Sequence, residues 1–563
     1  MQAARRLYLY AMSGVALAVV AAGLGILLEV ALAQSGLLER GPNAFSPPPR
    51  ERVSQAVAML GVGIPVWAVH WLLIQRGLAI GKSDRLAELG SAIRAGYLTL
   101  VLAVSLAFWV SSASTFLVSL IWSASGGGSS SPYLGLPDPV SGVSTAAVAF
   151  IVWLYHGVVR RADLGQGPVS GAAAWLPRLY LYGVSLGALV ASISGLQTFA
   201  TNTLAIPEFD EGYARLSAIQ GLVAFGAWGV VWTAHWWYAT RLAHSAGWRG
   251  VEEQTSRTRL AALVATIVVA VGFSIVAIAD LVQAVIGPAI GEVPNASDRT
   301  LQSAIRPLAG VIPWTIAWWA HVSWLRREPA AANPLRALHQ ARLATHAPAA
   351  IALALGGTGL GWLLGLGIDI AFGGNRRSDP DGVAWTFELA RWLPMAVVGL
   401  AIWAWHWSGV LARRRRDPEG EANSTIRRGF LYLTLGVGVV VALASATLTL
   451  YRLVGMVLGA DLTGNAVSEL STPMGAAAMA AIALVYHGLL LRADQQLRPV
   501  AAPDLAPAAI AGGPGSVLAE ALATTSRRSL ELVGPEGADL DAALAAARAA
   551  LPDGVRLDEP RAS

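Results

Sequence analysis

Long apolar runs recur along the whole chain and constrain its fold more than any other feature. Most are roughly 20 to 30 residues long, and about 20 apolar helical residues cross the hydrocarbon core of a bilayer. Charged residues make up 13% of the chain, roughly half of what a soluble globular protein carries. The sequence therefore predicts an all-α integral membrane protein whose main partner is the lipid bilayer.

The apolar runs repeat in a regular order. Six of them end in similar stretches, VWAVHW, VWLYHG, VWTAHW, AWWAHV, AWAWHW and ALVYHG, and alternate copies lie about 165 residues apart. The helix start Arg6-Leu7-Tyr8-Leu9-Tyr10 returns as RLYLY at residues 178–182. The repeating element is therefore a two-helix hairpin, and two hairpins form a four-helix unit that occurs three times. The six histidines are His70, His156, His235, His321, His406 and His487.

We expect twelve transmembrane helices in six hairpins. Because each hairpin has two spans, all copies share one orientation, and we expect a symmetry axis along the membrane normal. The units comprise residues 1–165, 166–330 and 331–495, and a linker with a small soluble tail follows at 496–563. The helices cover roughly residues 7–33, 54–75, 96–122, 141–159, 179–201, 214–240, 260–287, 303–325, 347–372, 386–411, 430–457 and 472–491.

The first apolar run imitates a cleavable signal peptide, because Ala31-Leu32-Ala33 follows it. The run is about 25 residues long, whereas a signal peptide has an apolar region of about 7–15. Its start also returns in the second unit. We therefore expect the run to remain in the protein as its first helix.

The arginines indicate the orientation. They are concentrated at the N-terminus and in the connections after the second helix of each hairpin, including the run at 413–416. The positive-inside rule then places both termini in the cytoplasm. The net charge of +5 is explained by this topology, so we expect no nucleic-acid partner.

Cysteine is absent from the chain. Disulfides, thiolate metal sites, iron–sulfur clusters and cysteine nucleophiles are thereby excluded. GVSLG at residues 183–187 matches the G-x-S-x-G pattern of a catalytic serine, but it lies inside an apolar run where the required strand-to-helix turn is not expected. No metal-ligand spacing occurs inside an apolar run. We expect no enzyme, no catalytic residue, no metal site and no cofactor, and the sequence identifies no substrate.

Glycines form a stripe in the ninth expected helix. Gly357, Gly361 and Gly365 follow one another at four-residue spacing. Small residues on one helix face allow a second helix to approach closely. The stripe therefore predicts a tight helix–helix contact.

Ionisable residues lie near the outward ends of several helices. Glu29, Asp280 and Asp369 each fall in the outward part of the first helix of a hairpin. Charges at membrane depth are costly and mark either a pathway or a paired partner. We leave both alternatives open, with Arg452 as a candidate to neutralise one of the acids.

The six histidines lie at one depth. Each is followed by an arginine four to seven residues later, which places the rings about 6–10 Å from the basic flank. Three hypotheses follow: ligation of haem b by pairs of histidines, a titrating vestibule for transport, or hydrogen bonds to carbonyls of neighbouring helices beneath a belt of tryptophans. The last is a structural role.

With these repeats in view, the chain resembles an uncharacterised bacterial membrane family, domain of unknown function 5671. The resemblance covers residues 1 to about 495 in three copies and is carried by the W-x-x-H helix ends and the Arg-Leu-Tyr-Leu-Tyr start. Leu484 replaces the tryptophan in the last copy. The resemblance implies no activity.

The sequence therefore favours a multi-pass protein of a bacterial inner membrane that acts in small-molecule or ion transport or as a membrane scaffold. A homo-oligomer is compatible with it. The alternative from another class is a haem-b-type electron-transfer protein with bis-histidine ligation. An absorption spectrum separates these hypotheses.

Overall fold

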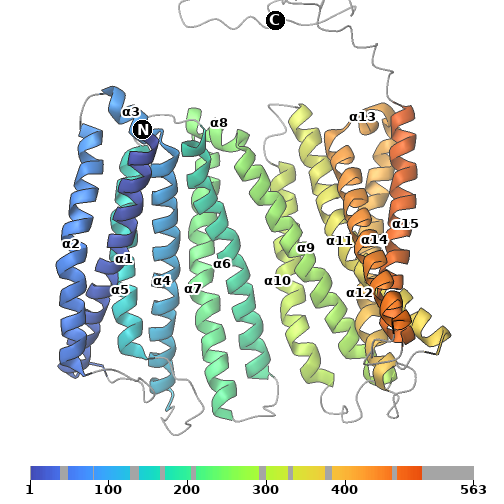
Figure 1. Cartoon of the computed structure of the whole chain (residues 1–563), viewed down its shortest axis with the longest axis horizontal. Helices are drawn as coiled ribbons and strands as arrows, with labels where there is room; N and C mark the ends of the chain where they lie inside the picture. The colour runs from blue at the N-terminus through green and yellow to red at the C-terminus, as the bar shows by residue number, and fades with distance from the viewer. Residues whose placement is uncertain are drawn as a thin grey trace, which may run out of the picture. The chain divides into compact units, whose positions relative to one another are not determined.

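The structure is a computed structural model that describes residues 2–38, 48–79, 82–126, 138–164, 171–204, 211–290, 300–327, 334–373, 383–458 and 466–497 (Figure 1). The described residues belong to one compact unit, Met1–Leu497. The soluble tail predicted after the linker lies outside the described residues.

Each four-helix unit of the described chain also contains one short helix between its two hairpins. The first unit consists of α1 (Gln2–Ser35), α2 (Pro49–Ala79), α3 (Lys82–Leu89), α4 (Ala92–Ala124) and α5 (Pro139–Leu164). The second consists of α6 (Ala172–Leu204), α7 (Glu211–Ala243), α8 (Trp248–Thr255), α9 (Arg257–Ile286), a 3₁₀ turn (Pro288–Ile290) and α10 (Thr300–Arg327). The third consists of α11 (Pro334–Ala371), α12 (Val383–Arg416), α13 (Pro418–Ala422), α14 (Thr425–Val457) and α15 (Ala466–Gln496).

Eleven helices in the described part of the chain are long and apolar enough to cross a membrane. The helix at the remaining expected position, α10, is not among them. It contains Arg306, Pro307 and Pro313 in its first half, and these residues lower its hydropathy. The short helices α3, α8 and α13 were not predicted, and they lie at the same end of the long helices (Figure 1).

The helix contacts repeat from unit to unit. The first long helix of a unit packs on the second, third and fourth, as α1 does on α2, α4 and α5. Between units, the third long helix packs on the first two of the next unit: α4 contacts α6 and α7, and α9 contacts α11 and α12. Among the described residues the first and third units share no extensive contact. The units are therefore joined in chain order, and the symmetry axis expected from the repeats is not formed.

The glycine stripe of α11 packs against α15, as predicted. A Cβ added to Gly475 would collide with the backbone of Gly361 and Gly365. The two helix backbones are thus in direct contact, which only small residues permit. On another face of α11, Gly356 meets Gly399 of α12 in the same way.

Candidate functional site

A polar network recurs at the end of the long helices that carries α3, α8 and α13, which we call the basic end. In the first unit, Arg6 Nε and the Tyr10 hydroxyl each donate to Glu88 of α3, both over 2.7 Å. Arg94 of α4 donates to the Tyr10 oxygen (3.0 Å) and to both carboxylate oxygens of Asp163 (2.8 and 2.9 Å). The network thereby joins α1, α3, α4 and α5.

The second unit contains the same arrangement. Arg178 of α6 donates to Glu253 of α8 over 2.8 Å, and the Tyr182 hydroxyl donates to the same carboxylate. Arg259 of α9 donates to the Tyr182 oxygen (2.8 Å) and to the carbonyl of Ala239 in α7 (3.2 Å). The positions of the arginines, the tyrosine and the glutamate correspond one by one to those of the first unit.

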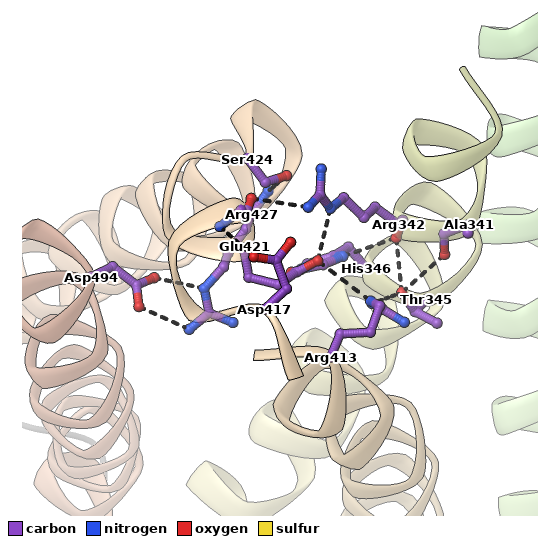
Figure 2. Close-up of polar contacts among 11 residues, drawn as sticks. Ala341, Arg342, Thr345, His346, Arg413, Asp417, Glu421, Ser424, Arg427 and Asp494 are labelled. Atoms are coloured by element: carbon purple, nitrogen blue, oxygen red, sulfur yellow. Dashed lines mark hydrogen bonds and ion pairs between the residues drawn. The ribbon is translucent and has the colours of Figure 1, made fainter. Parts of the chain in front are cut away.

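In the third unit a histidine takes the place of the tyrosine (Figure 2). Arg342 donates to Glu421 of α13 over 2.8 Å, and Arg427 donates to Asp494 of α15 over 2.6 Å. His346 lies between the two arginines and bonds the carbonyl of Arg342 (2.9 Å). Arg414 forms a second ion pair with Asp494 at 3.0 Å.

The central arginines of the three networks are fully buried. Arg94, Arg259 and Arg427 are at most 2% exposed. A buried charge is tolerated only when it is paired and hydrogen-bonded, and removing its partner costs about 3–5 kcal/mol. The networks therefore tie the short helix and the long helices of each unit together.

A local motif places these residues, and the sequence reasoning missed it. A glutamate is followed by a serine after three residues and by an arginine after six, beginning at Glu88, Glu253 and Glu421. The serine is the N-cap of the third long helix in each unit, and Ser256 and Ser424 accept the backbone N–H three residues later. The arginine then lies in the first turn. Its threefold occurrence about 165 residues apart is a signal that the sequence contains.

Five of the six histidines make the same contact within their own helices. In each of these five, Nδ1 lies 2.7–2.9 Å from the carbonyl four residues earlier. A carbonyl only accepts, so Nδ1 carries the proton. The prediction of bonds to carbonyls of neighbouring helices is therefore wrong for this nitrogen. The five histidines are His70, His156, His235, His321 and His487.

The other ring nitrogen reaches a neighbouring helix in three copies. With the proton on Nδ1, the neutral ring accepts at Nε2, and the partners are the Tyr8 hydroxyl for His70 (3.3 Å), Tyr97 for His156 (3.3 Å) and Tyr180 for His235 (3.2 Å).

The third unit lacks these tyrosines. Ala344 stands where Tyr8 and Tyr180 stand in the other units, and Phe430 stands where Tyr97 stands. The buried Nε2 atoms of His406 and His487 have no hydrogen-bond partner within the described residues. In the second unit, the ring of His321 packs against both Trp236 and Trp324.

The ionisable residues predicted at membrane depth differ in their partners and in their exposure. Glu29 is bound by Arg52 through two bonds of 2.5 and 2.6 Å. Arg452 pairs with Glu469 at 2.6 Å, an acid that the sequence reasoning did not consider. Asp280 is exposed.

Asp369 of α11 differs from all of these charges. It is fully buried, and within the described residues neither of its carboxylate oxygens has a hydrogen-bond partner. An isolated buried carboxylate is costly, so this position is the strongest functional candidate among the predicted acids. In the described part of the chain, no group of three or more His, Asp or Glu side chains is placed to hold a metal ion.

A cavity of about 1080 Å³ opens between the first two units at the basic end. Its lining comes chiefly from α5, α6, α7 and α8. Within it, Trp153 Nε1 donates to the Tyr180 oxygen (3.0 Å), and the Tyr180 hydroxyl in turn contacts His235 Nε2 (3.2 Å). One of the six predicted histidines therefore lies on the wall of a cavity.

Three segments of the chain, residues 6–155, 178–316 and 342–485, match one family model, described as a domain of unknown function (DUF5671). No curated protein and no solved structure matches the chain. The three segments correspond to the three repeated units and together cover more than half of the sequence. The chain therefore belongs to the family of domain of unknown function 5671, as three tandem copies.

Proposed function

We propose that this chain is a non-enzymatic scaffold protein of a bacterial inner membrane, with twelve membrane-spanning helices and both termini in the cytoplasm. The observation that carries the proposal is the threefold network of buried ion pairs at the basic end. Each network links its short helix to the long helices of the unit. A frame of this kind holds four helices in fixed positions.

The orientation is supported by the arginines of the basic end, because positive residues are retained on the cytoplasmic side. The count of twelve is supported by the short helices. The helices α8 and α13 lie at the same end (Figure 1), so an even number of spans must separate them. The helices between them are α9, α10, α11 and α12, and this arrangement supports α10 as the twelfth span.

The topology is tested by cysteine labelling, because the chain has no cysteine. Ala246→Cys places a thiol on an exposed residue of the basic end, and Leu37→Cys places one on a side chain that is 77% exposed at the other end. A membrane-impermeant maleimide should label Ala246→Cys only in inverted vesicles and Leu37→Cys only in intact spheroplasts. The reverse pattern would place both termini outside.

Transport is the second candidate, and Asp369 is the observation that favours it. A buried carboxylate without a partner is a group that a cation or proton could occupy. Purified chain in proteoliposomes should show no ion flux above that of empty liposomes. A pH-dependent flux that Asp369→Asn abolishes would establish transport and overturn the scaffold.

The haem alternative has its own readout. Five histidines already donate from Nδ1 to a carbonyl, and this leaves Nε2 as the nitrogen that would ligate iron. In three of them that nitrogen bonds a tyrosine. The absorption spectrum of the purified chain should therefore lack a Soret band. A Soret band that is lost in His406→Ala or His487→Ala would establish haem ligation instead.

A further inference from the structure

The cavity between the first two units has a lining that the scaffold does not require. We propose that it is a binding site for a phosphate-bearing anionic amphiphile, with the phosphate group held by arginines around Arg160 and the apolar part held by the walls. An anionic phospholipid and a soluble phosphate ester carry the same charged group. Charge, an unpaired arginine and the shape of the junction support this proposal independently.

The first support is the charge of the lining. Five arginines and two glutamates line the cavity, and one arginine, Arg178, pairs with both Glu252 (3.0 Å) and Glu253 (2.8 Å). The lining side chains therefore include three more arginines than carboxylates. Arginine binds phosphate through two parallel N–H donors, and basic pockets between helices near the cytoplasmic surface bind anionic headgroups. The remaining lining arginines are Arg160, Arg161, Arg241 and Arg249.

The second support is Arg160 itself. It is half-buried on α5 and forms no hydrogen bond or ion pair among the described residues. Asp163, three residues further along α5, accepts hydrogen bonds from Nε and Nη2 of Arg94. A half-buried guanidinium without a partner carries a desolvation cost that a bound anion would offset.

The charge at this position is specific to the first unit. Arg160 lies four residues after His156, and the residues four after His321 and His487 are Leu325 and Leu491. Leu325 is fully buried in the core that joins the second and third units. At the second junction this position is a buried leucine, and at the first junction, beside the cavity, it is an arginine.

The third support is the shape of the junction. Gly157, one residue after His156, lines the cavity, and a Cβ there would meet only Leu102, at 4.0 Å. The corresponding residue of the second unit is Val322, which is buried in the core. The walls add Leu181 and Trp237, so an apolar surface lies beside the arginines. This combination fits an amphiphile better than a small hydrophilic ion.

The test uses the full chain purified in a neutral detergent and follows thermal unfolding by tryptophan fluorescence. Short-chain phosphatidylglycerol, phosphatidylcholine of the same chain length, glycerol phosphate and inorganic phosphate are titrated separately. The variant is Arg160→Leu, which gives the first unit the residue of the other two and should fold for that reason. The matched control is Arg416→Leu, an exposed arginine of the basic end that does not line the cavity.

We expect phosphatidylglycerol to raise the Tm of the wild type and of Arg416→Leu, with half of the shift reached at the same lipid concentration. For Arg160→Leu, we expect that half-maximal concentration to be at least about tenfold higher. If glycerol phosphate or inorganic phosphate gives the Arg160-dependent shift and the lipids do not, the phosphate site stands and its ligand is soluble. Equal midpoints for Arg160→Leu and the wild type, or no shift with any anion, would overturn the proposal. Should Arg160→Leu fail to fold, Arg160→Gln provides the same comparison.

Discussion

The two junctions between units are built from equivalent helices and differ in what fills them. At the second junction, one core runs from Leu181 of α6 to Ala352 of α11 and includes Val322 and Leu325, and α10 packs directly on α11. At the first junction, α5 makes no extensive contact with α6 in the described residues, and Gly157 and Arg160 line a cavity.

The difference between the junctions shows that a repeated frame can acquire a site through very few side chains. Two positions one helical turn apart, valine and leucine in the second unit, are glycine and arginine in the first. The buried ion-pair networks are retained in all three units, so the exchange leaves the frame unchanged. The predictions below test this interpretation.

The largest effect is expected at the filled junction. Leu325→Arg would bury a guanidinium in an apolar core without a partner, and we expect it to destabilise the fold by at least about 4 kcal/mol. Unfolding in mixed micelles with increasing sodium dodecyl sulfate measures the change. The reciprocal Arg160→Leu should stay within about 1 kcal/mol of the wild type. Equal losses for the two exchanges would mean that the junctions do not differ as described.

The next effect concerns the frame that both junctions share. Glu253→Ala removes the fully buried carboxylate that pairs with Arg178 and accepts the Tyr182 hydrogen bond. We expect it to lower the free energy of unfolding by about 3–5 kcal/mol in the same assay. The neighbouring Glu252 is partly exposed and also pairs with Arg178, so Glu252→Ala should cost about 0–1 kcal/mol. A similar loss for both variants would argue against the buried network as the source of rigidity.

A smaller effect is expected on the wall of the cavity. Tyr180→Phe removes the hydroxyl that joins Trp153 to His235, and we expect a loss of about 1–2 kcal/mol. Tyr8→Phe is the matched change in the first unit, where the hydroxyl contacts His70 at 3.3 Å and the side chain is 56% exposed. It should cost less. Unfolding experiments on the two variants measure which loss in the free energy of unfolding is larger. A larger loss for Tyr8→Phe would contradict the role given to the Tyr180 hydroxyl on the cavity wall.

The smallest change in stability should come from filling the cavity. Gly157→Val introduces the residue of the second unit into open space, and we expect the free energy of unfolding to change by less than about 1 kcal/mol. The Tm shift caused by phosphatidylglycerol should nevertheless disappear. Gly488→Val, the corresponding change in the third unit, should leave that shift intact. A retained lipid effect in Gly157→Val would place the ligand elsewhere.

The architecture was largely predictable from the sequence. The apolar runs, the six histidine helix ends and the repeated helix start predicted the membrane-spanning helices and the three tandem copies, because bilayer thickness fixes the length of a span. The symmetry axis was predicted wrongly, because contacts between the units follow the chain order. The glycine stripe of α11 predicted a close helix–helix contact, and the structure identifies the partner as α15. The short helices were not predicted, since each is too short and too polar to stand out in hydropathy.

The site was harder to predict. The contact of Nδ1 with its own helix, made by five of the six histidines, follows from helix geometry, where a polar side chain can bond the carbonyl four residues earlier, and the sequence reasoning overlooked it. The pairing of Arg452 with Glu469 depends on the distance between α14 and α15, which spacing along the chain does not give. The cavity required coordinates, although Arg160 stands out when the three copies are aligned.

The accessibility of the two junctions tests the central claim most directly. In this cysteine-free chain, Gly157→Cys and Val322→Cys place one thiol at equivalent positions of the open and the filled junction. With inverted vesicles and a small impermeant maleimide, we expect Gly157→Cys to be labelled and Val322→Cys to be protected until the protein is unfolded. Equal protection of both thiols, or faster labelling of Val322→Cys, would contradict the account.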